Sequence, residues 1–394
     1  MTAASISGPP PVTGERLARA ALTRVFEPGD RKATALLREV GAKGLVARLA
    51  GRTDPPRGFT TFRWKGLCDR AARARPEHDL ETAARVGARF VCPGDTEWPA
   101  QLDDLGSARP LGLWVRGSVD LRMWALRSVA LVGARACTEY GAHVASRLAA
   151  DLAERGWVVV SGGAYGVDGA AHRGALGAGG ATAAVLACGI DRCYPAGHAQ
   201  LMKRIAQQGL LVGELPPGEH PTPSRFVLRN RVIAALTRGT VVVEAALRSG
   251  SLVTARAAQR MGRHTMGVPG PVTSGLSAGV HELLRAEGHL VTDAADVIEL
   301  VGAVGELGEE RRGPIVPRDL LTPEAARVLA VLPARGTIAA SDIALGAATV
   351  TDDAVARLYE LQALGFVERH GDGWQLTRQT GSPGFSTPGA VQGQ

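Results

Sequence analysis

Apolar residues between about positions 87 and 305 follow two alternating patterns. Short runs rich in Val, Leu and Ala, typical of buried strands, occur at 128–133, 157–162, 182–188, 210–215, 240–245 and 264–270. Amphipathic stretches with helical spacing separate them, at 139–155, 166–178, 197–208 and 226–238. Strands joined by helices are typical of βαβ units. We therefore predict that 87–305 is an α/β, Rossmann-like core with a parallel sheet buried on both faces.

A helical region precedes this core. Residues 16–50 carry apolar residues at helical spacing, interrupted at Pro28-Gly29, Gly41 and Gly44, which predicts a small cluster of short helices. The next segment is rich in arginine and weakly patterned, and we include it in one helical module, 16–80.

The chain after the core predicts another small domain, over 321–378. Three helices and then a hairpin are expected, at 322–332, 340–345, 350–364 and 366–377. This order is typical of a winged helix. The remaining segments are predicted to be a linker at 306–320 and disordered tails at 1–15 and 379–394.

Composition narrows the class of protein. At 394 residues the chain is long for one domain, and a hydrophobic fraction of 45% can fill more than one core. No apolar run reaches the roughly eighteen residues of a membrane span, and residues 1–14 lack a secretory signal pattern. The five cysteines include no C-x-x-C pair, which argues against a disulfide framework and a zinc site. We expect a cytoplasmic protein with no metal.

The net charge of +7 is unevenly distributed. Residues 1–90 hold 17 Lys and Arg against 9 Asp and Glu, whereas the rest of the chain holds 28 against 29. A basic surface attracts phosphate backbones. However, only four of the basic residues are lysine, and abundant arginine and alanine also reflect a GC-rich genome. Charge alone leaves both explanations open.

In an open parallel sheet, ligands bind beyond the carboxyl ends of the strands, so the loops there hold the candidates. The first such loop contains Gly133, Arg135 and Thr138. Glycine permits a tight turn, Arg135 can meet a phosphate and Thr138 can cap the next helix. The G-x-G-x-x-G spacing of dinucleotide-binding proteins is absent, which argues against a nicotinamide enzyme.

The next loop is rich in glycine. It carries the candidates Ser161, Gly162, Gly163 and Gly166, and closely spaced glycines are typical of a backbone nest that binds an anion. Asp168 and His172 lie four residues apart, so they share one face of a helix. They could supply a catalytic base, but we predict that they pair and fix the loop.

Two later segments add cations, an aromatic ring and hydroxyl groups. Phe226 lies close to Arg229, Asn230 and Arg231, in a stretch between Glu219 and Glu244 that has four arginines and no acid. Cations and an aromatic face are what single-stranded DNA needs, although Phe226 could equally pack in the core with the arginines in salt bridges. Further on, the run Ser249-Gly250-Ser251 either favours an anion at a helix start or simply caps the helix.

Taken in order, these segments resemble the DprA/Smf family of DNA-processing proteins. Residues 129–141 are similar to its V-A-I-V-G-S-R-x-x-T-x-Y-G motif, and 161–172 to S-G-x-A-x-G-I-D-x-x-A-H. Residues 188–195 resemble C-G-L-D-x-x-Y-P, 226–234 resemble F-P-x-R-N-R-I-I-A, and 244–255 resemble V-E-A followed by S-G-S-L-I-T-A. The match spans about 95–292. One difference is Ala134, which stands where the family usually has serine.

The resemblance implies a protein that binds single-stranded DNA as a homodimer and helps load RecA during natural transformation and homologous recombination. It implies no catalysis and no cofactor. By position, Arg135, Arg229 and Arg231 would contact phosphates and Phe226 would stack on a base. The other DNA-binding candidates are Gly133, Thr138, Ser161, Gly162, Gly163, Gly166, Asn230, Ser249, Gly250 and Ser251. The flanking domains resemble the SAM-like module and the optional winged helix of the family.

Two other functions stay open. Nucleotide phosphoribohydrolases share the wider fold group, but this chain lacks their P-G-G-x-G-T-x-x-E loop. A regulator could act through the C-terminal domain, but the expected recognition helix carries Asp352, Asp353 and Glu360 against only Arg357. An acidic helix fits the DNA major groove poorly, so a modulatory or protein-binding role suits this domain better.

Overall fold

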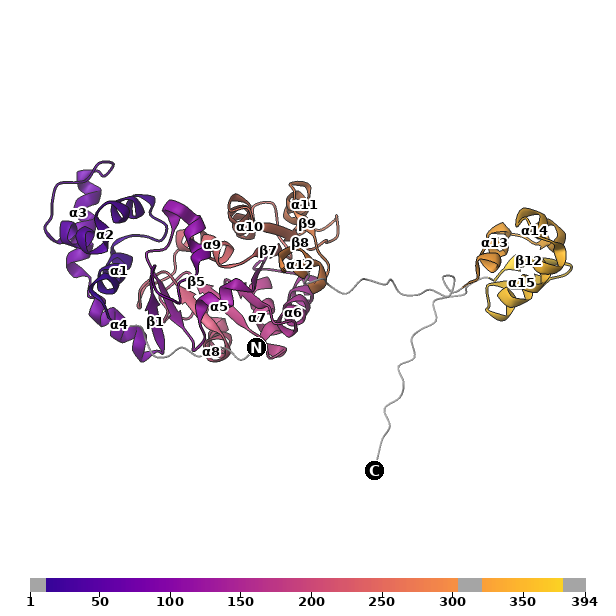
Figure 1. Cartoon of the computed structure of the whole chain (residues 1–394), viewed down its shortest axis with the longest axis horizontal. Coiled ribbons are helices and arrows are strands. Elements are labelled where there is room, and N and C mark those ends of the chain that lie inside the picture. Colours follow the sequence, from indigo (N-terminus) through magenta and orange to yellow (C-terminus); the bar gives the residue numbers. More distant parts are fainter. Residues whose placement is uncertain (1–11, 304–320, 378–394) are drawn as a thin grey trace, which may run out of the picture. The chain divides into compact units, whose positions relative to one another are not determined.

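The structure is a computed structural model that describes residues 12–303 and 321–377 (Figure 1). The chain divides into two compact units, Met1–Glu309 and Glu310–Gln394, and we describe each by itself. The predicted linker and the predicted C-terminal tail lie outside the described residues, as does most of the predicted N-terminal tail.

One sheet of nine strands organises the described part of the first unit. Its spatial order is β1-β2-β6-β5-β4-β3-β7-β8-β9. The strands are β1 (Ala88–Val91), β2 (Leu113–Arg116), β3 (Ser128–Val132), β4 (Val158–Ser161), β5 (Thr182–Leu186), β6 (Leu210–Gly213), β7 (Gly239–Val242), β8 (His264–Gly267) and β9 (His289–Leu290). Strands β3 to β9 pair in parallel, whereas β1 and β2 are antiparallel at one edge. The prediction of an α/β core on a mostly parallel sheet is confirmed.

Both faces of the sheet are buried, as predicted. Along β3, Val129 and Leu131 point into one core while Ala130 and Val132 point into the other, because side chains alternate along a strand. One face is covered by α6 (Glu139–Glu154), α7 (Val167–Gly177), α8 (Ala199–Gln208) and α12 (Ala294–Val301). The other is covered by η1 (Ala100–Ala108), α5 (Leu121–Leu126), α9 (Pro223–Leu236), α10 (Gly250–Arg260) and α11 (Ala278–Arg285). A short η2 (Ala196–His198) precedes α8.

The order of the strands creates a crevice beside β3. From β3 the chain proceeds through β4 and β5 to β6 on one side, and it then crosses back to place β7 on the other side. The helices that follow β3 and β7 therefore cover opposite faces, and their connecting loops diverge at the carboxyl edge. Such a switch point is where open α/β sheets bind ligands.

Four helices precede the sheet: α1 (Gly14–Val25), α2 (Arg31–Ala50), α3 (Thr61–Arg73) and α4 (Pro76–Arg85). Helices α1, α2 and α3 share a core that includes Leu22, Leu45 and Trp64, whereas Ala83 of α4 packs in a core beside the sheet. Gly41 interrupts α2 with a φ of 69°, as the sequence predicts, whereas Gly44 does not interrupt it. Several arginines of this region bind acids within the unit, among them Arg16 with Asp95, Arg24 with Asp79 and Arg89 with Glu97. Part of the basic excess is therefore neutralised internally.

The second unit has its own small core. It contains α13 (Pro323–Val331), α14 (Ala340–Gly346), α15 (Thr351–Ala363) and a three-stranded sheet of β10 (Ile338–Ala339), β12 (Gly373–Leu376) and β11 (Val367–His370). Leu329, Leu358 and Trp374 are among its buried residues. The three helices and the hairpin lie where the sequence predicts them, while β10 was not expected. In neither described segment is any helix both long and apolar enough to span a bilayer.

Candidate nucleic-acid interface

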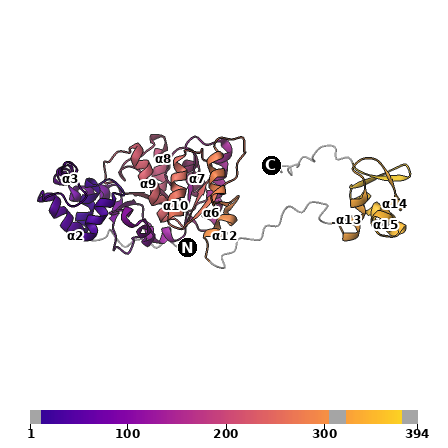
Figure 2. The same ribbon diagram turned by 90° about the horizontal axis from the view of Figure 1, so that it is seen from above.

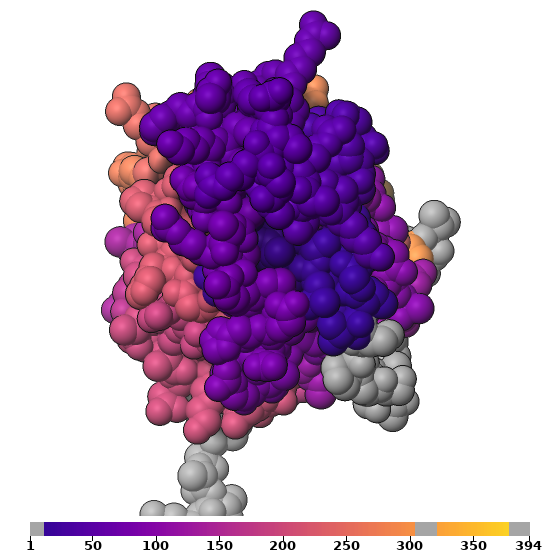
Figure 3. All heavy atoms as spheres, turned by 90° about the vertical axis from the view of Figure 1, so that its left-hand side faces the viewer, coloured from indigo at the N-terminus to yellow at the C-terminus, as the bar shows by residue number. Residues whose placement is uncertain are grey.

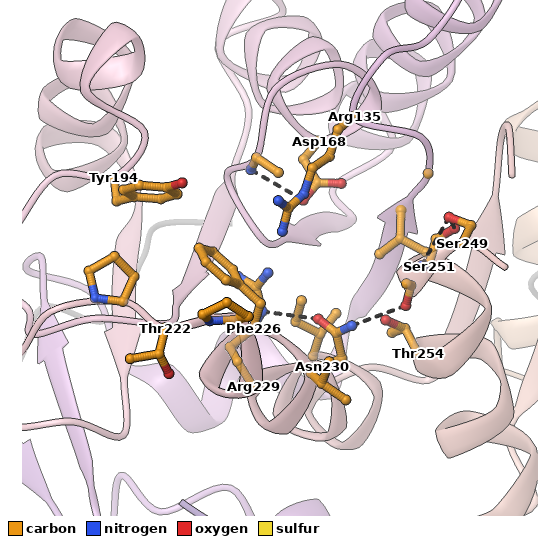
Figure 4. Close-up of a pocket in the computed structure, with 18 residues that line it drawn as sticks. Arg135, Asp168, Tyr194, Thr222, Phe226, Arg229, Asn230, Ser249, Ser251 and Thr254 are labelled. Atoms are coloured by element: carbon orange, nitrogen blue, oxygen red, sulfur yellow. Dashed lines mark hydrogen bonds between the residues drawn. The ribbon is translucent and has the colours of Figure 1, made fainter. Parts of the chain in front are cut away.

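A cavity of about 520 Å³ opens at the crevice beside β3 (Figure 4). Its walls come from the loops after β3, β4, β5, β6 and β7, from α9 and from the start of α10. The lining residues are Val132, Gly133, Arg135, Ala164, Asp168, Tyr194, Pro221, Thr222, Pro223, Phe226, Val227, Arg229, Asn230, Ile233, Ser249, Gly250, Ser251 and Thr254. Segments distant in sequence thus converge at the edge that the sequence analysis singled out.

A cation and two aromatic rings meet inside this cavity. The Arg135 guanidinium carbon lies 4.7 Å from the centre of the Phe226 ring, and that ring lies 5.3 Å from the ring of Tyr194. Figure 4 shows Arg135 reaching from its loop toward Phe226. Arg135 is exposed and makes no ion pair with any residue in 12–303 or 321–377. Its charge is available to an anionic ligand.

Hydrogen bonds to Glu244 hold the loop that carries Arg135 in place. The Glu244 carboxylate accepts hydrogen bonds from the Thr138 backbone N–H (2.9 Å) and hydroxyl (2.6 Å), and its carbonyl accepts one from Ala134 N–H (2.7 Å). Thr138 also caps α6 by accepting from Gly141 N–H (3.1 Å), as predicted. The Thr138 hydroxyl therefore serves the loop, and Thr138 is not among the lining residues.

The predicted anion nest is already filled. Asp168 Oδ2 accepts hydrogen bonds from the backbone N–H groups of Gly162 (3.1 Å) and Ala164 (3.3 Å), so a carboxylate of the protein occupies the place expected for a ligand. Burial raises the pKa of Asp168, and the neighbouring Arg229 and these N–H groups oppose the rise. The expectation of an open phosphate nest in this loop is corrected accordingly.

Asp168 and His172 take separate partners and do not form the expected pair. The His172 Nδ1 atom lies 2.7 Å from Thr182 Oγ1, and the Thr182 hydroxyl itself donates to Val159 O. His172 must therefore donate from Nδ1, which leaves Nε2 buried and without a partner among the described residues. Burial lowers the pKa of His172 to about 3. His172 is therefore a neutral, buried side chain that packs in the core.

Arg229 is a buried positioning residue. Only 7% of it is exposed, and its Nη1 donates to Gly162 O (2.7 Å) and to Val185 O. A Cβ on Gly162 would lie 2.4 Å from Arg229 Nη2, which explains the glycine. Burial lowers the pKa of Arg229 to about 10, so it stays protonated at neutral pH. It borders the cavity, yet its Nε and Nη1 groups donate to oxygen atoms of the protein.

Polar groups of α9 and α10 complete the far wall. Asn230 accepts from Arg229 Nε (3.2 Å) and donates to Gly250 O (3.1 Å), which ties the two helices together. Ser249 caps α10 by accepting from Ser251 N–H (3.3 Å), and the two serine hydroxyls lie 2.7 Å apart. Both roles considered for these serines, helix capping and anion binding, are compatible with the structure, because the serines cap α10 and also line the cavity.

Several predicted site residues lie elsewhere. Ser161 is fully buried and donates to Leu131 O (2.6 Å). Arg231 donates to both carboxylate oxygens of Glu214 (2.6 Å) and does not line the cavity. The other candidates outside the lining are Gly162, Gly163 and Gly166, which shape the loop after β4. The structure therefore does not bring Arg231 to the groove with Arg135.

Other lining residues were not proposed from sequence. Tyr194 lies in the loop after β5 and is 44% exposed. Thr222 and Pro223 form the start of α9, where Thr222 caps the helix by accepting from Arg225 N–H (3.3 Å). A threonine followed by proline is a helix-start signal, so the sequence could have placed this rim. In the described segments, no three His, Cys, Asp or Glu side chains gather to hold a metal.

Comparison with known proteins points to one family. The family described as DNA recombination-mediator protein A matches residues 89–302. A DNA processing protein DprA of Mycobacterium tuberculosis is 44% identical over 368 residues, which cover 91% of this chain and 93% of that protein. The DprA of Streptococcus pneumoniae is 41% identical over 52% of this chain and 71% of its own length. Its X-ray structure matches 74% of this chain and 99% of that chain with a TM-score of 0.62 at 30% identity. The chain is therefore a member of the DNA recombination-mediator protein A (DprA/Smf) family, whose proteins process DNA.

Proposed function

We propose that the cavity beside β3 binds single-stranded DNA, with Arg135 on a phosphate and with Phe226 and Tyr194 against a base. The observation that carries this proposal is the exposed Arg135, which has no ion-pair partner in 12–303 or 321–377 and lies 4.7 Å from the centre of the Phe226 ring at the carboxyl edge of the sheet. A cation beside aromatic faces is the combination that single strands require. In a duplex the base faces are already stacked on one another, so the ring of Phe226 offers little to double-stranded DNA.

Phe226 has to be free for this role, and its surroundings allow it. The ring is partly exposed, and its neighbours in the cavity are the movable side chains of Arg135 and Tyr194. A base that stacks on Phe226 would displace the Arg135 guanidinium from the ring toward the adjoining phosphate. The Arg135 side chain would thus exchange its contact with Phe226 for a contact with the ligand. Arg229, by contrast, supports the proposal as a buried positive charge that holds the loops in place.

The wider assignments rest on the family and on the domain plan. We propose that the protein acts without catalysis, as a homodimer, and helps load RecA on single strands in recombination and transformation. Glu244 and Asp168, the acids near the cavity, are both engaged in loop hydrogen bonds, which argues against either as a catalytic base. We interpret the core as Rossmann-like, the preceding helices as a SAM-like module and the second unit as winged-helix-like, with the boundaries given above.

The direct test is a salt-titrated binding experiment with fluorescent single-stranded and double-stranded oligonucleotides. We expect tighter binding to single strands and an affinity that falls linearly with log salt, because each neutralised phosphate releases a counterion. A preference for duplex, or an affinity that does not respond to salt, would refute the proposal. Turnover of a nucleoside monophosphate in a parallel assay would instead support the enzyme alternative.

A further inference from the structure

A second group of cations and aromatic rings lies on the helices before the sheet. Phe59 precedes Thr60, which caps α3 by accepting from Arg63 N–H (3.2 Å). The Phe59 ring packs edge-on against Trp64, with ring centres 5.5 Å apart. This is a hydrophobic staple, which fixes the chain where it enters the helix. Arg63 and Lys32 then lie over the same ring, at 5.0 and 5.5 Å from its centre.

Phe62 stands on the first turn of the same helix and is 91% exposed. Lys65 follows it by three residues and is also exposed, so the ring and the ammonium group share one face of α3. We call Phe59, Phe62, Lys32, Arg57, Arg63 and Lys65 the α3 patch. Isolated exposed apolar residues are ordinary. Phe62 is a different case, because it is almost fully exposed and the other five side chains of the patch include four cations.

The charge of this surface suits a polyanion. Segments 30–32 and 54–65 contain five cations, with Asp30 and Asp54 as their acids. Asp30 is occupied, because it caps α2 through the backbone N–H groups of Lys32 (3.0 Å) and Ala33 (3.2 Å) and also binds Arg63. Among the described residues, Arg57 and Lys65 have no ion-pair partner. The excess positive charge is therefore presented to solvent.

A chain of contacts connects the α3 patch to the rim of the cavity. Arg225, the residue before Phe226, donates to both carboxylate oxygens of Glu27 (2.9 and 3.0 Å). Glu27 lies three residues before Asp30, which binds Arg63 at the patch. In Figures 1 and 2, α9 lies between α10 on one side and α2 and α3 on the other. The helices that carry the patch also cover much of the end of the unit seen in Figure 3.

From this arrangement we infer that the α3 patch is a second contact for the strand held in the cavity. The inference rests on the proposed function. A strand leaving the cavity past Thr222, at the start of α9, continues toward α3, where Phe62 offers a stacking face and Lys65 and Arg57 offer cations to phosphates. Because stacking does not depend on base identity, this contact would be indifferent to sequence. The patch would not affect the binding of short strands, because they end before they reach it.

The test compares oligonucleotides of about 5 and about 20 nucleotides on the full-length chain, the first near the lower end of known single-strand site sizes and the second beyond their upper end. We expect Phe62→Ala to weaken binding of the long strand at least about fivefold, the low end of one base–aromatic stack, and to leave the short strand unchanged. Lys65→Ala should reduce the salt slope of the long strand alone, by roughly 0.7. Phe62→Trp should keep the long-strand affinity.

Matched controls come from α5, which directly precedes β3 and so lies at the amino ends of the parallel strands, away from the cavity. Met123 and Arg122 are exposed there, and their alanine variants should leave both strands unaffected. If wild type and Phe62→Ala bind the long strand equally, the inference is overturned. The α3 patch would then be a candidate surface for a protein partner. If the short strand does not bind even the wild type, it is the proposed cavity site that fails. A strand carrying 4-thiothymidine that crosslinks to α3 only when long would support the inference directly.

Discussion

Arg135 and Arg229 border the same cavity, yet they have opposite characters. Arg135 is exposed, without an ion-pair partner in the described segments, and stacked on a ring. Arg229 is buried and donates to two carbonyl groups of the loops it supports. A guanidinium that donates its hydrogen bonds within the protein contributes positive electrostatic potential and holds its loops rigid. An unpaired guanidinium can instead contact a ligand. Substitutions at the two positions should therefore differ in kind.

Replacing Arg135 by alanine should weaken single-strand binding and reduce its salt slope by roughly 0.7 to 1, because one phosphate contact is lost. Thermal stability should not change, since the side chain is exposed. Anisotropy titrations across a salt series, with Arg122→Ala as the control, measure both slopes. An unchanged slope in the Arg135 variant would place the phosphate contact elsewhere.

Replacing Phe226 by alanine should cost about 1–3 kcal/mol of binding free energy through lost stacking, with the salt slope nearly unchanged. Phe226→Tyr should restore most of the affinity. Val227→Ala is the matched control, because Val227 is the next residue and also lines the cavity. Melting temperatures recorded beside the affinities distinguish a ligand contact from a core residue. A large loss of stability in Phe226→Ala would identify the ring as part of the core.

His172 should make the protein acid-sensitive. Its pKa is about 3 in the folded chain, below the ordinary value of 6.5, so as pH falls below about 6.5 the unfolded chain binds a proton that the folded chain does not. Stability conferred by the neutral imidazole is thus present above pH 6.5 and declines toward pH 3. His172→Asn, which can still donate to Thr182, should flatten the fall in melting temperature between about pH 7 and 5.5. Parallel curves for variant and wild type would contradict this.

At the scale of elements, apolar runs predicted β3 to β8 to within a few residues, because strands buried on both faces are continuously apolar. Strands β1 and β2, which have four residues like β4 and β6, were missed because Arg89 and Arg116 interrupt their apolar pattern. Arg89 is accommodated through tertiary contacts, namely its pair with Glu97 and hydrogen bonds to Gly117 O and Val119 O. Helix α3 was missed because its apolar positions are few, with Trp64, Leu67 and Cys68 as its buried residues.

The site was predictable as a set of loops but not as a set of contacts. Strand ends and family motifs located Arg135, Phe226 and Ser249 correctly at one edge. Arg229 and Arg231 were expected in one groove, yet residues two apart on a helix point about 200° apart, so a single groove could not receive both. No local pattern reveals that Asp168 would occupy the glycine loop, because that depends on how α7 packs behind it.

The loops after β3 and β4 act as one unit, and Gly166 is where they touch. Its φ is 74°, and a Cβ there would lie 2.3 Å from Ala134 O and 2.4 Å from Arg135 O. Gly166→Ala should cost roughly 2 kcal/mol or more of stability and also lower DNA affinity, because the loop carrying Arg135 must move. Gly177→Ala, on the same helix with no atom within 4 Å of the new Cβ, is the control and should retain both properties. Normal DNA affinity in Gly166→Ala would show that the loops are independent.

At the scale of the whole molecule, the two units should contribute unequally to DNA binding. Helix α15 carries Asp352 and Asp353 in its first turn, and its Arg357 donates to Glu360 (2.8 Å). A chain lacking residues 318–394 should therefore bind single strands within about twofold of the full-length protein. Circular dichroism confirms that the shortened chain is folded before its affinity is compared. Loss of most affinity in a folded truncation would assign DNA binding to the second unit.

The carboxylate of Asp168 in the glycine loop has a consequence for how the proposed site would distinguish a DNA strand from a free nucleotide. A pre-formed, empty phosphate nest would bind any mononucleotide and be saturated by the cellular pool. Here the protein's own anion fills it, so a free nucleotide would meet the side chains that line the cavity, such as Arg135 and Phe226, but no open nest in this loop. A polymer brings many such contacts on one tether, and each raises the effective concentration of the next. On the proposed function, discrimination between strand and monomer would therefore arise from avidity.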